Sequence, residues 1–327
     1  MILKFNDILD QGKAKELLLR AVSLGKMGHA FLFKGPAGVG KKTLAQVFAA
    51  YLNCRRPENR EPCGRCPSCL KFSSGNHPDF ILIEPEGAAI KISQVRELIK
   101  TLAFPPFEAR YRIVLLADIH TMRREAANSL LKTLEEPPAD TILILTGDEA
   151  GDILATIISR CQVIPFFPLP YEQVAAALTQ EGIPGDNAFT LAAMAEGSLG
   201  RARLLHQKDQ LQLRGEIIDA LSSLERNRPA TVQAIYDLAE KCAKQKEDLV
   251  ELLELVKTWF HDLILLMNNA GDKIINHDLA AAMPANGKRW NFEELSDKLQ
   301  LISLAQKQLN RNCNATAVCE VLFFNLL

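Results

Sequence analysis

The sequence has no long hydrophobic run and no excess of charge of either sign. No stretch of about 18 apolar residues occurs among its 327 residues, so no membrane-spanning helix is expected. Residues 1–7 lack the pattern of a signal peptide, and we therefore expect a cytoplasmic protein. Lysines and arginines number 38 and acidic residues 39. Tight DNA binding by the chain alone is not expected from this balance, because phosphate binding needs a local positive excess.

Apolar runs and helical patterns alternate over the first half of the chain. Short apolar runs predict five strands, at residues 29–33, 80–83, 112–117, 141–146 and 162–164. Helical patterns separate them, at residues 41–52, 93–101, 123–135 and 153–159. This alternation predicts an α/β region, with a parallel sheet and helices on both faces.

A proline-rich segment at residues 165–170 ends this pattern, and no strand pattern follows it. Three prolines within six residues indicate a stiff, extended linker. Helical patterns continue to the end, at residues 171–181, 187–195, from about 199, and at 211–224, 230–242, 247–267, 292–309 and 315–326. Residues 268–288 are the longest expected loop. The second region is therefore predicted to be all-α, and the chain is predicted to divide into residues 1–166, 167–208 and 209–327.

A glycine-rich segment after the first predicted strand has the spacing of a phosphate-binding loop, Gly35-x4-Gly40-Lys41. Such a turn directs backbone N–H groups at phosphate oxygens, and the lysine reaches the terminal phosphates. The candidate nucleotide-binding residues are Gly35, Gly38, Gly40, Lys41 and Thr43. The hydroxyl residue expected after Lys41 to hold magnesium is missing, because position 42 is lysine and Thr43 comes one residue late. Nucleotide binding and a turn without a ligand both stay open.

The strand at residues 112–117 lacks an acid where nucleotide hydrolases carry one. In such enzymes an aspartate after a buried strand orients magnesium, and a glutamate next to it polarises water. Here Ala117 takes the first position and Asp118 the second. Two magnesium contacts are thus missing, and we do not expect this chain to hydrolyse ATP. Two alternatives stay open for Asp118: a shift of register into the first role, or a simple capping role.

Two further residues are candidates for contact with a phosphate group. Thr146 ends the fourth predicted strand, where its hydroxyl either senses a γ-phosphate or closes a turn. Arg160 lies in the triplet Ser159-Arg160-Cys161, after a predicted helix. A guanidinium that reaches the γ-phosphate of a neighbouring subunit stabilises the charge of the transition state. Arg160 is therefore the candidate catalytic residue, acting in trans, and a solvated or structural arginine is the alternative.

The cysteines cluster at one place, Cys54-x8-Cys63-x2-Cys66-x2-Cys69. A Cys-x-x-Cys spacing lets two thiolates reach one ion, and four thiolates complete a tetrahedral zinc shell. Such a site has no open position for water, so the zinc would be structural. Disulfides, an iron ion and an empty site are the alternatives. The other cysteines are isolated and expected to be buried: Cys161, Cys242, Cys313 and Cys319.

Taken in order, these segments resemble the clamp-loader branch of the AAA+ ATPases. The resemblance runs through residues 29–33, the loop 35–41, the four cysteines, His77-Pro78-Asp79, residues 92–96, residues 128–138 and Ser159-Arg160-Cys161. It implies an AAA+ P-loop domain with a zinc knuckle at residues 54–69, a small helical lid, and a C-terminal helical collar for oligomerisation. An arginine of the lid often touches the nucleotide in related ATPases, whereas this chain has Gly200 there and Arg201 next.

The resemblance also implies a function in DNA replication. The implied complex belongs to the bacterial DNA polymerase III holoenzyme, a nucleotidyltransferase complex, and loads the sliding clamp onto primed DNA. The implied partners are motor subunits (gamma/tau) and a delta subunit in a hetero-pentamer, with the clamp and primer–template DNA reached through the complex. Because its magnesium ligands are missing, this chain is expected to be a scaffold whose Arg160 serves the ATP of an adjacent motor subunit. An active clamp-loader ATPase and a stand-alone zinc-bearing DNA-binding protein are the alternatives.

Overall fold

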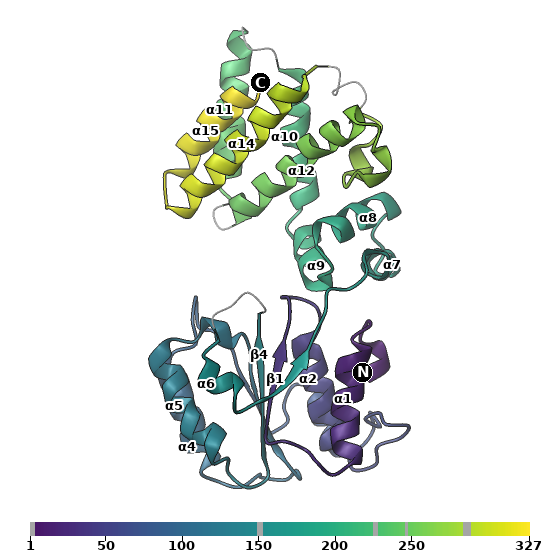
Figure 1. Cartoon of the computed structure of the whole chain (residues 1–327), viewed down its shortest axis with the longest axis vertical. Coiled ribbons are helices and arrows are strands. Elements are labelled where there is room, and N and C mark those ends of the chain that lie inside the picture. Colours follow the sequence, from purple (N-terminus) through teal and green to yellow (C-terminus); the bar gives the residue numbers. More distant parts are fainter. Residues whose placement is uncertain (1–3, 149–152, 225–227, 246–247, 284–288) are drawn as a thin grey trace. The chain divides into compact units, whose positions relative to one another are not determined.

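Five short strands form one parallel sheet in the first half of the chain (Figure 1). They are β1 (Ala30–Lys34), β2 (Phe80–Ile83), β3 (Arg112–Leu116), β4 (Thr141–Gly147) and β5 (Gln162–Pro165). Their order is β2-β3-β4-β1-β5, and every neighbouring pair is parallel. All residues of β3 and β4 are buried, as expected for inner strands that are covered on both faces. The predicted parallel sheet is confirmed.

Helices cover both faces of this sheet. They are η1 (Phe5–Asp7), α1 (Gly12–Ser23), α2 (Lys41–Leu52), α3 (Pro67–Ser73), α4 (Ile92–Leu102), η2 (Ile119–Thr121), α5 (Arg124–Glu135) and α6 (Ala155–Ile158). Helices α1 and α2 lie on one side, and α4, α5 and α6 on the other (Figure 1). Strand residues alternate between the two cores: Phe31 and Phe33 belong to the core with α1 and α2, and Leu32 belongs to the core with α4 and α5.

Two of these α-helices, α1 and α3, were not expected from the sequence, and neither were the short helices η1 and η2. Helix α1 buries Ala14, Leu18 and Ala21, a helical spacing that gives it one apolar face. Helix α3 begins at Pro67 inside the cysteine-rich segment, where a proline in the first turn needs no N–H partner. The helix predicted over residues 153–159 is shorter in the structure, where α6 spans only Ala155–Ile158.

The rest of the described chain is helical. The helices are α7 (Tyr171–Gln180), α8 (Gly185–Met194), α9 (Leu199–Gln207), α10 (Gln210–Ser223), α11 (Pro229–Ala243), α12 (Leu249–Met267), η4 (Gly271–Lys273), η5 (His277–Leu279), α14 (Phe292–Asn310) and α15 (Ala315–Leu326). Their core includes Trp259, Phe260 and Phe323, all buried. The predicted all-α region is confirmed. The described part of the expected loop at residues 268–288 contains η4 and η5.

This computed structural model describes residues 4–148, 153–224, 228–245, 248–283 and 289–327. It has two compact units, Met1–Pro170 with Gly197–Gly200, and Tyr171–Glu196 with Arg201–Leu327. The division into three parts at residues 166 and 208 stays a prediction. Among the described residues, no helix is both long and apolar enough to cross a membrane.

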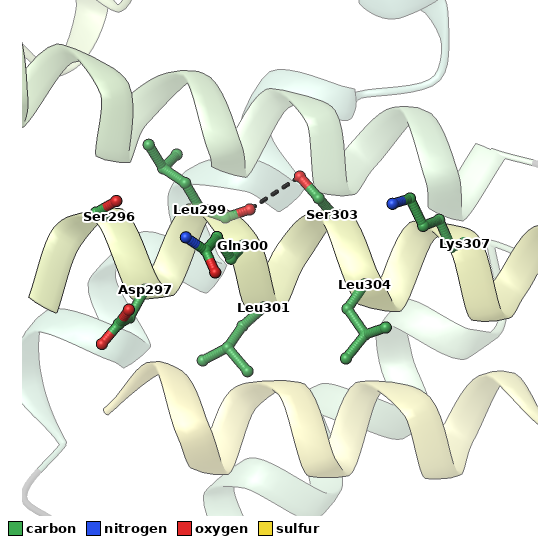
Figure 2. A pocket seen from close by; sticks show the side chains of 8 residues that line it. All are labelled: Ser296, Asp297, Leu299, Gln300, Leu301, Ser303, Leu304 and Lys307. Atoms are coloured by element: carbon green, nitrogen blue, oxygen red, sulfur yellow. Dashed lines mark hydrogen bonds between the residues drawn. The ribbon is translucent and has the colours of Figure 1, made fainter.

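An open groove of about 750 Å³ lies along α14 in the helical unit (Figure 2). Its lining residues are Ser296, Asp297, Leu299, Gln300, Leu301, Ser303, Leu304 and Lys307. Leu301 and Leu304 point to the same side of the helix, toward α15 (Figure 2). More than half of the Leu304 side chain is exposed. The helical unit therefore presents apolar side chains at its surface along α14.

Candidate functional site

The phosphate loop connects β1 to α2 with the backbone shape that its glycines predict. Gly38 and Gly40 have φ angles of 71° and 99°, in the left-handed region that favours glycine. Gly40 is the N-cap residue of α2, and Lys41 is the first residue of that helix. Thr43 follows in the first turn and is half-buried. The loop thus has the strand-to-helix geometry of a P-loop.

The ammonium group of Lys41 lies inside this loop. Its Nζ donates hydrogen bonds to the carbonyl oxygens of Gly35 and Pro36, and the residue is 6% exposed. Burial lowers the pKa of Lys41, whereas the carboxylates of Asp148 and Asp118 act in the opposite direction. The loop itself therefore accepts the hydrogen bonds that Lys41 would give to a phosphate.

Residues 197–200, which belong to the same compact unit, lie against the loop. The N–H of Gly200 donates to the carbonyl of Gly38 at 3.0 Å. A Cβ atom at residue 200 would lie 2.9 Å from the Cα of Gly38, so the backbones can approach this closely only at a glycine. The nucleotide-binding arginine of related ATPases would not fit here without a shift of the loop. Arg201 is paired with Glu251 and Glu196.

The positions that hold magnesium in related enzymes have other partners. Lys42 forms an ion pair with Glu84, which directly follows β2. Ala117 is buried directly after β3 and offers no ligand. Within the described ranges, no group of three or more histidine, cysteine or acidic side chains gathers at this loop. Neither Lys42, in its ion pair, nor Ala117 offers a metal ligand here.

Polar groups from neighbouring strands meet at the carboxyl edge of the sheet. The hydroxyl oxygen of Thr146, in β4, accepts the N–H of Asp118 at 3.0 Å. Asp118 is the N-cap residue of η2, but its side chain makes no capping hydrogen bond. Asp148, just beyond β4, also acts electrostatically on Lys41 and was missed in the sequence. Its position two residues after Thr146 is the signal that could have found it.

The four clustered cysteines are brought together by α2, the loop after it and α3. The Sγ atoms of Cys54, Cys63, Cys66 and Cys69 all lie within 4.8 Å of one another, and all four thiols are free. None of these four cysteines is paired in a disulfide in the structure. The Sγ atoms of Cys54 and Cys63 accept the backbone N–H groups of Cys63 and Cys66, at 3.3 and 3.4 Å. Such a cluster of thiols could hold a metal ion.

The thiols of the cluster differ in how easily they ionise. Hydrogen bonds from backbone N–H groups, that of Arg65 above all, lower the pKa of Cys63 to about 6. Burial raises the pKa of Cys54 and of Cys69. A bound cation would favour the thiolate form of all four.

His77 lies beside the cluster without joining it. Its Nδ1 accepts the N–H of Asp79 at 3.2 Å, so Nε2 carries the proton and donates to the Ser68 hydroxyl at 3.1 Å. Its ring stacks on Phe72, with 4.3 Å between ring centroids. His77 therefore connects α3, which carries Cys69, to the start of β2.

The isolated cysteines are not all buried, as the sequence had suggested. Cys242 and Cys319 are buried in the helical unit, and Cys161 is half-buried. Cys313 is exposed, because it lies in the turn between α14 and α15 rather than on an inward helix face.

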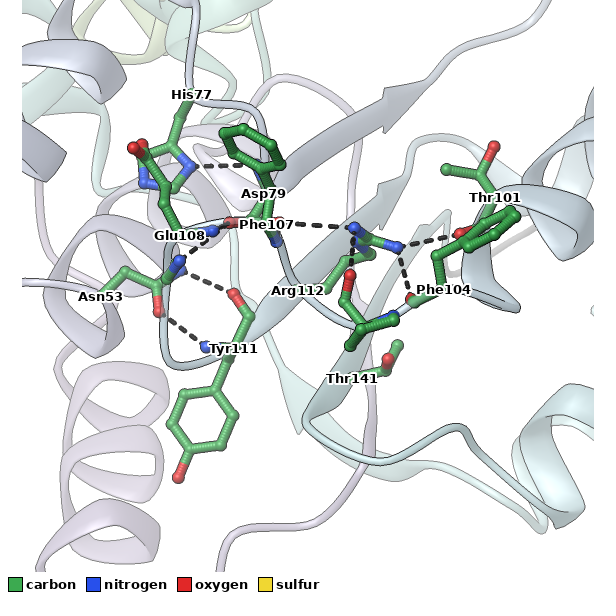
Figure 3. A network of polar contacts seen from close by, with 12 residues as sticks. Asn53, His77, Asp79, Thr101, Phe104, Phe107, Glu108, Tyr111, Arg112 and Thr141 are labelled. Atoms are coloured by element: carbon green, nitrogen blue, oxygen red, sulfur yellow. Dashed lines mark hydrogen bonds and ion pairs between the residues drawn. The ribbon is translucent and has the colours of Figure 1, made fainter.

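A buried ion pair holds the segment between α4 and β3 (Figure 3). The carboxylate of Asp79 accepts three backbone N–H groups, those of Phe107, Glu108 and Ala109. The guanidinium of Arg112 lies 3.5 Å from that carboxylate.

The Arg112 guanidinium also donates to three backbone carbonyls, those of Thr101, Phe104 and Pro105. This network fixes a loop that exposes Phe104 and Phe107, by 71% and 82%.

Arg160 lies at the surface between α6 and β5, with 32% of its side chain exposed. Its Nε and Nη2 donate to Oε1 of Glu135, the former at 2.8 Å. Its Nη1 donates to the carbonyl oxygen of Thr156 at 2.9 Å. The guanidinium is thus anchored by its own chain and still partly open to a neighbouring molecule.

Comparison with known proteins gives the family. The family described as "DNA polymerase III, delta subunit" matches residues 10–170, and its C-terminal counterpart matches residues 208–327. The DNA polymerase III subunit delta' of Bacillus subtilis is 28% identical over 316 residues, which are 97% of this chain and 96% of that protein. The chain belongs to the delta-prime family of DNA polymerase III subunits. The resemblance to the clamp-loader branch of the AAA+ ATPases is therefore confirmed.

Two more DNA polymerase III proteins are similar to this chain. The subunit delta' of Pseudomonas aeruginosa is 38% identical over 203 residues, 60% of this chain and 61% of that protein. Among solved structures, a gamma-subunit-related DNA polymerase III protein from Thermotoga maritima is 19% identical, with a TM-score of 0.48 over 96% of this chain and 97% of that one. As a member of this family, the chain functions in DNA replication, in the loading of the sliding clamp.

Proposed function

We propose that the chain is a non-motor subunit of the clamp loader, which acts as a scaffold and donates Arg160 to the ATP of an adjacent motor subunit. One contrast carries the proposal. Lys41 donates to two carbonyls of its own loop, whereas Arg160 presents a partly exposed guanidinium. The first arrangement disfavours a nucleotide in this chain, and the second suits a phosphate held by a neighbour.

The altered loop supports the same assignment. ATP hydrolysis by this chain would need magnesium, and both positions that supply its ligands have changed, to Lys42 and Ala117. Lys42 is paired with Glu84, and Gly200 lies on Gly38 where an arginine would be needed. Asp118, Thr146 and Thr43 remain near the loop as parts of the P-loop fold, without a nucleotide to bind.

The proposed partners are the motor subunits and a delta subunit. A protein named DNA polymerase III subunit tau/gamma, from Haemophilus influenzae, is 34% identical over 60% of this chain and 29% of its own length. Shared ancestry of this extent suits subunits that assemble into one ring. We propose a hetero-pentamer of gamma/tau, delta and this chain, held together by the helical collar. This complex would contact the sliding clamp and primer–template DNA in the cytoplasm.

The ion of the cysteine cluster is proposed to be zinc, with a structural role. A tetrahedral zinc with Zn–S bonds of about 2.3 Å places its sulfur ligands about 3.8 Å apart. Cys63 and Cys69 have their sulfur atoms 3.9 Å apart, which fits this value. Cys54, Cys63, Cys66 and Cys69 would hold the ion and leave no position for water, so the ion would fix the loop between α2 and α3.

The test is the ATPase rate of the reconstituted loader, stimulated by clamp and primed DNA. Arg160→Ala is expected to slow hydrolysis at the adjacent ATP site by about a hundredfold or more, because an arginine in trans contributes at least that much at the site it serves. Lys41→Ala is expected to change the rate less than about twofold, because in this proposal Lys41 is bonded to its own loop and holds no nucleotide. A large loss with Lys41→Ala and none with Arg160→Ala would show instead that the chain is itself a motor.

A further inference from the structure

The guanidinium of Arg160 is held along one edge by a carboxylate of its own chain. Oε1 of Glu135 accepts from both Nε and Nη2 of Arg160. Nη1 donates to the carbonyl of Thr156 at 2.9 Å and faces Oγ of Ser159 at 3.3 Å. A guanidinium has five N–H donors. Among the described residues these contacts leave the second donor of Nη2, which can meet a phosphate oxygen.

Both anchors of Arg160 lie on fixed parts of the fold. Glu135 is the last residue of α5, which ends there because Pro137 disfavours helical geometry at Glu136. The preceding turn is fixed in the core through Leu130 and Leu134, both buried. Thr156 lies in α6, whose Ile157 belongs to the same core. Two rigid elements therefore determine the plane and direction of the guanidinium.

We propose that Glu135 is a positioning residue for Arg160, a role that rests on the proposed function of Arg160 in trans. An unanchored arginine samples many rotamers and loses that freedom when it meets a phosphate. Glu135 restricts the side chain before the neighbouring subunit arrives, so less freedom is lost on contact. Because the carboxylate binds only the Nε–Nη2 edge, the outer part of the guanidinium stays available.

The test uses the reconstituted loader with its motor and delta subunits, and measures kcat and KM for ATP with clamp and primed DNA. Glu135→Ala is expected to lower kcat about threefold with KM unchanged, in the range of an exposed ion pair. Glu135→Gln keeps an acceptor oxygen and is expected to lose less than about twofold. Glu136→Gln is the matched control, because it removes the same charge from the adjacent exposed residue, and no change is expected.

A double-mutant cycle separates positioning from a purely structural role. In the Arg160→Ala background, Glu135→Ala is expected to have no further effect on kcat, since its action passes through the guanidinium. Thermal unfolding of the chain checks that both single variants fold.

The outcomes distinguish the two levels of the proposal. If Arg160→Ala leaves the rate intact, the proposed function fails, and the role of Glu135 with it. If Arg160→Ala collapses the rate but Glu135→Ala has no effect, acts equally in both backgrounds, or raises the rate, the function stands and the positioning role is wrong.

Discussion

Two loops of the α/β unit, the phosphate loop at residues 35–41 and the cysteine loop at residues 54–69, differ in what they can still bind. The phosphate loop keeps the left-handed glycines and the helix start, but its lysine is bonded to its own carbonyls. The cysteine loop keeps all four sulfur atoms close together. The backbone shape of the phosphate loop is needed for folding, because this loop must connect β1 to α2 whether or not a nucleotide binds. A set of four thiols has no comparable use in folding unless an ion joins them.

Loss of the proposed zinc ion should have the largest effect, and it tests whether the four thiols hold a metal. Cys63→Ser is expected to abolish metal binding and lower the melting temperature by about 10 °C, since ligands bind the ion only in the folded state. Metal analysis with a thiol count, followed by calorimetry, measures both. Cys313→Ser removes an exposed cysteine outside the cluster and should leave both unchanged. Equal stability with and without metal would contradict the structural role.

The second-largest effect is expected for the buried ion pair between Asp79 and Arg112. Burial acts to raise the pKa of Asp79, but the N–H groups of residues 107–109 and the charge of Arg112 outweigh it, so its pKa is lowered. Arg112→Met is expected to cost about 3 kcal/mol of unfolding free energy at pH 7, because it leaves a buried carboxylate without its partner. Urea unfolding measures this loss. Asp219→Asn, on the exposed surface of α10, is the control and should cost nearly nothing.

The pH dependence of stability follows from the same shift. A lowered pKa means that Asp79 stabilises the fold fully above its unfolded pKa of about 4, and that this contribution is lost as the pH falls through the lower, folded value. Asp79→Asn is therefore expected to flatten the acid limb of the stability curve. An acid limb as steep as in the wild type would show that other carboxylates cause it.

The smallest expected effect concerns the contact that closes the phosphate loop. Gly200→Ala is expected to cost about 1–2 kcal/mol, because its Cβ would lie 2.9 Å from Gly38 and one backbone must move. Gly215→Ala in α10 meets no atom within 4 Å and should stabilise the chain by about 0.5–1 kcal/mol. If both substitutions stabilise equally, Gly200 does not lie on the loop as described.

Local sequence patterns predicted the features whose residues are close together in the chain. The phosphate loop, the cysteine cluster and the end of α5 before Pro137 depend on spacing within a few residues, and the strands follow from apolar runs. The features that the sequence did not predict depend on contacts between residues that are far apart in the chain. Gly200 reaches Gly38, and Arg112 reaches Asp79, only after the chain has folded. Glu135 gains its importance from Arg160, with which it forms an ion pair, and no local pattern marks it. Asp148 acts on Lys41, and only its position two residues after Thr146 could have indicated it.

The central claim is that this chain serves a neighbour's ATP and binds none of its own. The most direct measurement counts ATP bound and ATP hydrolysed per loader in a single turnover, with wild-type chain, Arg160→Ala and Lys41→Ala. The account predicts that all three loaders bind the same number of ATP molecules and that Arg160→Ala alone slows the hydrolysis of one. A loader that loses a bound ATP with Lys41→Ala would contradict it.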